Sequence, residues 1–154
     1  MSEKKQEIDG RFGRTRLLLG GEAMARLSGA RVIVFGAGGV GGYVIEALAR
    51  SGVGAIDVVD NDEVSLSNLN RQVIALETTI GRAKVDVAIE RVGEINPWCR
   101  CVGYKQFYLP ENADAIDLSA YDYVVDCIDT VKAKMELARR CVRLDVRHIC
   151  SMGA

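Results

Sequence analysis

A glycine-rich turn after an apolar run is the first feature of this sequence that could do chemistry. Residues 31–35 (Arg-Val-Ile-Val-Phe) lead into Gly36, Gly38 and Gly41 at G-x-G-x-x-G spacing, with Gly39 between them. In a strand–turn–helix context, such glycines let the backbone approach a phosphate at the positive end of the helix. The same glycines can instead serve only close packing of the helix on the strand. We favour a nucleotide site.

An acidic residue closes the next apolar run. Asp60 follows residues 55–59, at the distance from the glycines at which a carboxylate binds the ribose hydroxyls of a nucleotide. An aspartate there can also simply form a turn after a strand. Taken alone, Asp60 and the glycines would also fit a NAD-dependent oxidoreductase. Which nucleotide binds at this site therefore depends on the residues that follow.

Several polar side chains beyond Asp60 fit a triphosphate better than NAD. Asn68 and Arg71 lie in the next loop, Lys84 opens a helix, and Asp129 follows a later apolar run. Arg or Lys can neutralise the charge that accumulates on departing pyrophosphate, whereas hydride transfer to nicotinamide needs no extra cation. A carboxylate such as Asp129 can hold the Mg²⁺ that bridges phosphates. The alternatives are solvated charges for Arg71 and Lys84, and a helix N-cap for Asp129.

The elements that must position these residues alternate between strand and helix. We expect strands at residues 31–35, 55–59, 99–104, 123–127 and 147–151, and helices at residues 11–27, 39–51, 82–95 and 131–144, the first interrupted at Gly20-Gly21. This alternation predicts a doubly wound, Rossmann-like α/β fold with a mainly parallel sheet and helices on both faces. Residues 60–76 read as a long polar loop, and such loops usually carry function.

Length and composition favour one domain with a short arm before it. The 154 residues carry 20 Lys+Arg and 21 Asp+Glu, so the bulk charge indicates neither nucleic acid nor a membrane as partner. We expect residues 1–28 to form a helical arm and residues 29–154 a nucleotide-binding domain. Because the sequence stops just past an expected strand, where ligands bind in such folds, we expect a fragment that is truncated at its C-terminal side and poorly active alone.

Cysteine usage predicts a reducing compartment. No C-x-x-C pair, signal peptide or membrane-length apolar run is present, so we expect a cytoplasmic protein with reduced, mostly buried thiols and no zinc site. We expect Cys127 inside a strand and Cys150 in the core. His148, the only histidine, is expected to be structural. The five cysteines are Cys99, Cys101, Cys127, Cys141 and Cys150.

Seven segments, in order along nearly the whole chain, resemble the HesA/MoeB/ThiF family of adenylating enzymes, relatives of the ubiquitin-activating enzymes. They are residues 11–14, 36–41, 60–62, 67–72, 80–84, 95–97 and 126–129. The resemblance implies that ATP binds here with Mg²⁺ and that a substrate carboxylate attacks the α-phosphate to form an acyl-adenylate.

The resemblance also assigns roles to single residues. The nucleotide-binding set that it implies is Gly36, Gly38, Gly39, Gly41, Asp60, Asp62, Asn68, Arg71 and Lys84. Arg71 and Lys84 would also act in catalysis around the triphosphate, and Asp129 resembles the aspartate linked to magnesium. Arg14 resembles a catalytic arginine that homodimers of the family supply from the partner subunit, so dimerisation would complete the active site.

Within the family, residues 70–76, 107–112 and 121–132 most resemble the tRNA threonylcarbamoyladenosine dehydratases. Those enzymes activate the threonyl carboxylate of a modified adenosine in tRNA, which then cyclises with loss of water. MoeB- and ThiF-like members instead adenylate the C-terminal glycine of a ubiquitin-like sulfur-carrier protein, and they more often have glutamine where this chain has Asn70. The tRNA activity is therefore the preferred hypothesis, sulfur-carrier activation the second and a NAD-dependent oxidoreductase the third.

Overall fold

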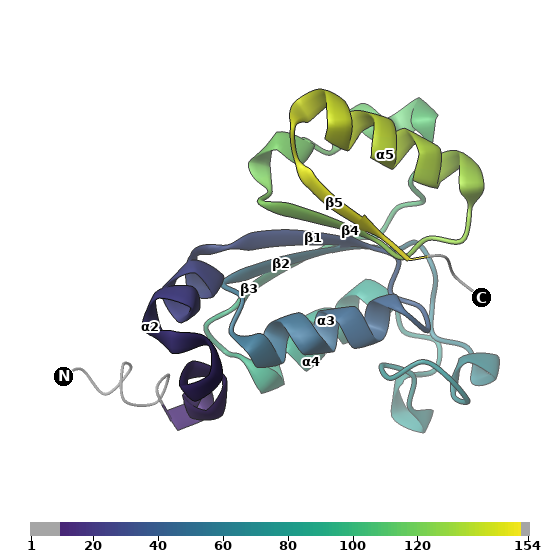
Figure 1. Ribbon diagram of the computed structural model, residues 1–154. Coiled ribbons are helices and arrows are strands. Elements are labelled where there is room, and N and C mark those ends of the chain that lie inside the picture. Colours follow the sequence, from purple (N-terminus) through teal and green to yellow (C-terminus); the bar gives the residue numbers. More distant parts are fainter. Residues whose placement is uncertain (1–9, 152–154) are drawn as a thin grey trace.

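A parallel sheet of five strands forms the centre of the computed structural model, which describes residues 10–151 (Figure 1). The strand order is β3-β2-β1-β4-β5, and every neighbouring pair is parallel. The strands are β1 (Arg31–Phe35), β2 (Ala55–Val59), β3 (Arg100–Tyr104), β4 (Tyr123–Asp126) and β5 (Arg147–Cys150). The chain reverses its direction of winding between β1 and β4, the place where doubly wound folds bind ligands. The predicted fold class is confirmed.

Helices cover both faces of this sheet. They are α2 (Gly13–Gly29), α3 (Gly41–Ser51), α4 (Lys84–Ile95) and α5 (Val131–Leu144). Figure 1 shows α3 and α4 on one face and α5 on the other. Val32 and Val34 of β1 pack on the side of α3 and α4, whereas Ile33 and Phe35 join a second apolar cluster with α5. Because both faces are covered, β1 is apolar at successive positions instead of alternating ones.

The predicted elements are all present, with shifts at their ends. The structure begins α3 at Gly41 and α4 at Lys84, two residues later than expected in each case. Since β4 ends at Asp126, the prediction that Cys127 lies inside the strand is wrong. The long loop after β2 contains one short 3₁₀ turn, η1 (Leu66–Asn68), and is followed by η2 (Glu77–Thr79), while η3 (Pro110–Ala115) and η4 (Leu118–Ala120) lie between β3 and β4.

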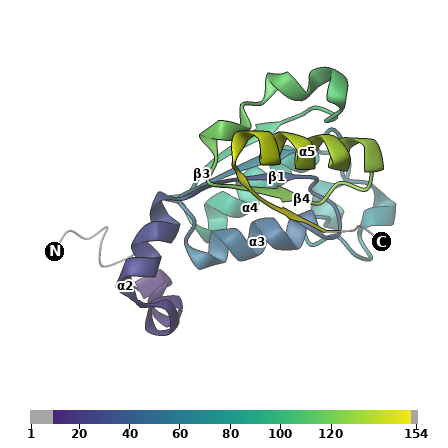
Figure 2. The ribbon, with the colours of Figure 1, turned by 45° about the horizontal axis from the view of Figure 1, so that its top comes forward.

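The N-terminal helix α2 contacts the end of the sheet domain at which the strands begin (Figures 1 and 2). Phe12 is buried there, and Arg11 donates from Nη1 to the carbonyl of Ile95 at 2.8 Å. The predicted interruption is confirmed, because Gly20 has non-helical backbone angles (φ 81°, ψ 166°) inside α2. In the part of the chain that the structure describes, no helix is long and apolar enough to cross a membrane.

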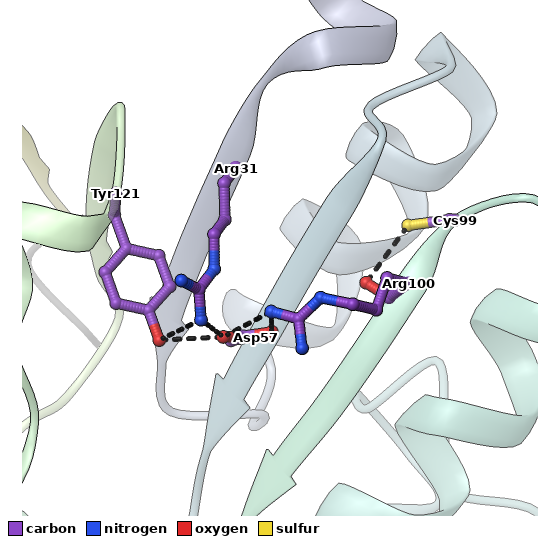
Figure 3. A network of polar contacts seen from close by, with 5 residues as sticks. All are labelled: Arg31, Asp57, Cys99, Arg100 and Tyr121. Atoms are coloured by element: carbon purple, nitrogen blue, oxygen red, sulfur yellow. Dashed lines mark hydrogen bonds and ion pairs between the residues drawn. The ribbon is translucent and has the colours of Figure 1, made fainter.

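A buried carboxylate ties three strands to the segment before β4 (Figure 3). Asp57, at the middle of β2, is fully buried and accepts hydrogen bonds from Arg31 Nη2 at 2.6 Å and from the Tyr121 hydroxyl at 2.7 Å. Arg100 of β3 approaches the same carboxylate at 3.3 Å, and the Arg31 guanidinium lies 4.2 Å from the centre of the Tyr121 ring. These contacts lie toward the end of the sheet at which β1 and β3 begin, away from the carboxyl ends of the strands.

Candidate nucleotide-binding site

A cavity of about 340 Å³ opens at the carboxyl ends of the strands. It is bounded by the segments that follow β1, β2, β3 and β4, so residues far apart in the sequence meet there. The predicted site residues that line it are Gly36, Gly38, Gly39, Asp60, Asp62, Asn68, Arg71, Lys84 and Asp129. Gly41 and Arg14 are not among the lining residues.

The glycine turn is built by two close backbone approaches. Gly36 has a φ of 90°, and a β-carbon there would lie 2.8 Å from the carbonyl oxygen of Cys127. Gly41 is buried behind the turn, where a β-carbon would lie only 1.7 Å from the carbonyl oxygen of Gly36. Gly41 therefore serves the close packing of the helix on the strand, which was the alternative interpretation of the glycines. It lets α3 start directly under the turn.

We expect Gly41→Ala to destabilise the protein, because the new methyl group has no space against the Gly36 carbonyl. Overpacking of this kind costs about 1–3 kcal/mol or more in unfolding free energy. Gly93→Ala is the matched control: nothing lies within 4 Å of its added β-carbon, and alanine favours the helix by up to about 1 kcal/mol. Urea denaturation measures both, and equal midpoints for the two variants would contradict the packing role.

Asp60 is fixed by two backbone hydrogen bonds. Its Oδ2 accepts from the amide of Ala37 at 2.7 Å, and its Oδ1 accepts from the amide of Asp62 at 2.8 Å. The carboxylate is therefore held between the glycine turn and the loop after β2. An ionised carboxylate has about four acceptor positions, so Asp60 keeps capacity for the two hydroxyls of a ribose.

Lys84 is a buried cation at the start of α4. Its side chain is only 6% exposed, and its Nζ lies 2.9 Å from Oδ2 of Asp62, which is 58% exposed. The backbone amide of Lys84 also donates to the carbonyl of Asp62 at 3.0 Å. The interpretation of Lys84 as a solvated surface charge is therefore wrong. A buried ammonium that lines a cavity is placed to attract an anion.

Arg71 and Asn68 are positioned by the loop itself. Arg71 Nη1 donates to the carbonyl of Ser67 at 2.7 Å and to Oδ1 of Asn70 at 2.9 Å. Asn68 is buried, and its Oδ1 accepts from the amide of Ser65 at 3.1 Å. Among residues 10–151, the bonds described for the Arg71 guanidinium use only Nη1, so its other nitrogens are available for a phosphate.

Asp129 lies at the mouth of the cavity with an exposed carboxylate. Its one described contact is with the Thr130 hydroxyl at 3.5 Å. The N-cap of α5 is Thr130, so the alternative interpretation of Asp129 as the N-cap is wrong. The turn that carries Asp129 is fixed by Asp126, whose Oδ1 accepts from the amide of Ile128 and from Lys134 Nζ, both at 3.0 Å.

Two thiols differ from expectation. Cys127 is half-buried and lines the cavity, and burial raises the pKa of its thiol to about 11, so it is protonated at neutral pH. Cys150 is exposed, with Sγ 3.3 Å from Lys134 Nζ, so its expected place in the core is wrong. Of the five cysteines only Cys141 is fully buried: Cys99 and Cys101 lie at or next to the edge strand β3, Cys150 lies on the edge strand β5, and Cys127 faces the cavity after β4. His148 is the second residue of β5, and burial lowers its pKa.

Sequence reasoning did not assign several residues that line the cavity. Gln72 ends the segment of residues 67–72, but the sequence assigned it no role. Its side chain is buried, and its Oε1 has no hydrogen-bond partner among the described residues. Gln106, Phe107 and Tyr108 directly follow β3. The signal that could have found them is topological, since the carboxyl ends of parallel strands converge on one edge.

Arg14 lies apart from these residues, on the exposed surface of α2. That helix contacts the opposite end of the sheet from the cavity (Figure 1). The described residues contain no group of three or more His, Cys, Asp or Glu side chains that could hold a metal ion by themselves. A metal at Asp129 would therefore need ligands from a bound molecule.

Comparison with known proteins gives one consistent family. Residues 12–154 match the ThiF family. The tRNA threonylcarbamoyladenosine dehydratase of Bacillus subtilis is 43% identical over 143 residues, which are 93% of this chain and 56% of that protein. The adenylyltransferase and sulfurtransferase uba4 of Pyricularia oryzae is 39% identical over 136 residues, which are 87% of this chain and 28% of that protein.

A solved structure adds the same relationship in three dimensions. The Escherichia coli tRNA N6-threonylcarbamoyladenosine dehydratase in complex with ATP has a TM-score of 0.87 and 39% identity, with 92% of this chain and 58% of that chain covered. The chain thus spans about half the length of the curated dehydratases that it matches. With the family match over residues 12–154, these similarities show that the chain belongs to the ThiF family.

Proposed function

We propose that this chain supplies the ATP site of an adenylating enzyme. A carboxylate oxygen of the substrate attacks the α-phosphorus, the bond to the bridging oxygen breaks, and an acyl-adenylate and pyrophosphate form. The observation that carries the proposal is one cavity that holds Asp60, the Gly38–Gly39 turn, Lys84 and Arg71 together. The relative solved with ATP supports the same nucleotide here.

Asp60, the start of α3, Lys84 and Arg71 would each have a task in this reaction. Asp60 would accept hydrogen bonds from the ribose, and the positive end of α3 would face the phosphates. Lys84 and Arg71 would neutralise the charge that develops on pyrophosphate. Because hydrogen bonds already fix these groups, little reorganisation is needed when the charge appears.

Magnesium fits the mouth of the cavity. Mg²⁺ in nucleotide sites is commonly bound by one or two carboxylates together with substrate phosphates, and Asp129 offers an exposed carboxylate there. We assign Asp129 to this ion, which would supply further neutralisation of phosphate charge when it is bound.

For the acceptor we propose the threonyl carboxylate of threonylcarbamoyladenosine in tRNA, whose activation precedes cyclisation and loss of water. Relatives named as dehydratases of this nucleoside, at 41–43% identity, support the choice. A tRNA acceptor would place the enzyme in the cytoplasm. The alternative acceptor is the C-terminal glycine of a ubiquitin-like sulfur carrier, which the uba4 relative supports less strongly because so little of that protein is covered.

Exchange of labelled pyrophosphate into ATP tests this proposal with the full-length protein. We expect threonylcarbamoyladenosine-containing tRNA to stimulate the exchange and a sulfur-carrier protein to leave it unchanged. Stimulation by the carrier alone would select the alternative acceptor. A thermal shift measurement is the control for the nucleotide, since ATP with Mg²⁺ should stabilise the protein and NAD should not; stabilisation by NAD alone would contradict the ATP site.

We also propose that Arg14 acts in the cavity of a partner subunit, because it lies at the other end of its own domain. Arg14→Ala and Lys84→Ala should each be inactive alone. In a homodimer with two-fold symmetry, mixing the two variants should restore about a quarter of wild-type exchange, since half of the dimers are mixed and have one intact site of two. Exchange that stays at background after subunit mixing would exclude this arrangement.

A further inference from the structure

The turn that carries Asp129 is held by a charged pair that lies outside the cavity. Asp126, the last residue of β4, has a fully buried carboxylate, and its Oδ1 accepts from the amide of Ile128 at 3.0 Å. Lys134 Nζ donates to the same oxygen at 3.0 Å. Since neither Asp126 nor Lys134 lines the cavity, this pair can affect a bound nucleotide only through the turn.

Lys134 also joins the end of β5 to this turn. Its side chain is 10% exposed, and its Nζ donates to the Ser151 carbonyl at 2.7 Å and contacts Cys150 Sγ at 3.3 Å. Together with the bond to Asp126, these contacts use the three protons of the ammonium group. The Ser151 amide in turn donates to the Asp126 carbonyl at 2.9 Å. One ammonium group therefore connects the carboxyl ends of two neighbouring strands.

The buried charge of Asp126 depends on Lys134. Among residues 10–151, Asp126 Oδ2 has no hydrogen-bond partner, and neither has His148 Nε2, which lies 4.0 Å from it. Burial lowers the pKa of His148, so the imidazole is neutral at neutral pH and supplies no charge. Lys134 is therefore the cation that balances this carboxylate, and a buried charge that loses its partner is strongly unfavourable.

The other side of the turn is held by the backbone. The Cys127 amide donates to the Phe35 carbonyl at 2.8 Å, and the Cys127 carbonyl leaves no space for a β-carbon at Gly36. For the Asp129 carboxylate, the one contact described is with the Thr130 hydroxyl at 3.5 Å. The position of this carboxylate at the mouth of the cavity is therefore set by the turn and by the groups that fix the turn.

We propose that Lys134 is a positioning residue: acting through Asp126, it holds Asp129 where Mg²⁺ and the ATP phosphates would meet. This inference rests on the proposed function, in which Asp129 receives the ion. Removing a group that orients a metal ligand typically weakens metal binding by about 10–100-fold. Loss of Lys134 should therefore weaken the binding of the metal ion and leave the binding of metal-free nucleotide unchanged.

Binding of Mn²⁺, a paramagnetic substitute for Mg²⁺, tests this role in the full-length protein. Lys134→Met alone leaves a buried, unpaired carboxylate, so the test variant combines it with Asp126→Asn and removes both charges. With an ATP analogue that has a methylene group between its α- and β-phosphates, electron paramagnetic resonance should show Mn²⁺ bound about 10–100-fold more weakly than in the wild type. Binding of the same analogue in EDTA should be unchanged.

Exchange kinetics give a second measurement. The apparent constant for Mg²⁺ should rise by the same factor in the double variant, whereas the exchange rate at saturating Mg²⁺ should stay within a few-fold of the wild type. A loss of the saturated rate with an unchanged constant for Mg²⁺ would overturn the proposal, because a misplaced metal carboxylate weakens binding of the ion first.

Arg140→Met is the matched control. Arg140 is another cation of α5 with a side chain only 6% exposed, but its partners are Asp114 at 2.7 Å and the Ile116 carbonyl at 3.1 Å, outside the turn after β4. This variant should bind Mn²⁺ as the wild type does, whatever its urea midpoint. Mn²⁺ binding within about twofold of wild type in the folded double variant refutes the positioning role alone, whereas a wild type that does not bind the ATP analogue refutes the proposed function itself.

Discussion

Replacing Lys84 with alanine should lower the rate of ATP–pyrophosphate exchange by about 10²–10³-fold, the usual effect of removing one preorganised group that stabilises transition-state charge. The reason is the position of this cation. Lys84 is buried in the cavity wall and is held by Asp62 at 2.9 Å, so no flexible side chain at the surface can replace it. The loss should appear mainly in kcat, because the charge that Lys84 neutralises grows as pyrophosphate leaves.

A matched control separates this effect from general electrostatics. Lys105 is also a lysine paired with a carboxylate, Glu63 at 3.4 Å, but it is exposed and lies outside the cavity. Lys105→Ala should keep wild-type exchange. The Lys84 variant should remain folded, because the carboxylate that loses its partner, Asp62, is mostly exposed to water. Exchange within a few-fold of wild type in a folded Lys84→Ala enzyme would remove the assigned role.

The sheet could be predicted from the sequence because each of its elements is encoded locally. Residues 31–35 and 55–59 are short apolar runs bounded by glycines and aspartates, and both strands have these bounds in the structure. The fold class then follows from the alternation of strand and helix, although β3 and β4 are joined by 3₁₀ turns instead of a helix and the strand order itself was not predicted. Asp60 and the glycine turn were found for the same reason, since their places are defined relative to the two strands.

Features that depend on packing could not be predicted in this way. No spacing in the sequence shows that Gly41 faces the Gly36 carbonyl, that Lys84 is buried or that Cys150 is exposed at an edge strand. For Phe107, the strand order could have indicated a place near the carboxyl ends of the strands, but its 45% exposure at the cavity depends on how the loop after β3 folds. Each of these facts is set by a neighbour that is remote in the sequence or in the sheet.

The Asp57 network is the extreme case, and it predicts a large loss of stability. Asp57 interrupts an apolar strand, and its partners Arg31, Tyr121 and Arg100 are 26, 64 and 43 positions away along the chain. The carboxylate is fully buried, so its cost of leaving water is offset only by these partners. Figure 3 shows that the two guanidinium groups converge on one carboxylate.

Asp57→Asn should therefore lower the free energy of unfolding by about 3 kcal/mol, the lower end of the range for breaking a buried pair, because both arginines keep some contact with water. Arg100→Ala should cost less, since its side chain is 53% exposed and its nitrogen lies farther from Asp57. Glu111→Gln, which breaks an exposed pair with Lys132, should leave the urea midpoint unchanged. If the Asp57 and Glu111 variants unfold at the same urea concentration, the buried carboxylate does not hold the strands together. If Asp57→Asn unfolds at a lower urea concentration than Glu111→Gln, and the folded Asp57 variant keeps wild-type exchange, this network belongs to the scaffold. The chemistry then belongs to the cavity at the carboxyl ends of the strands.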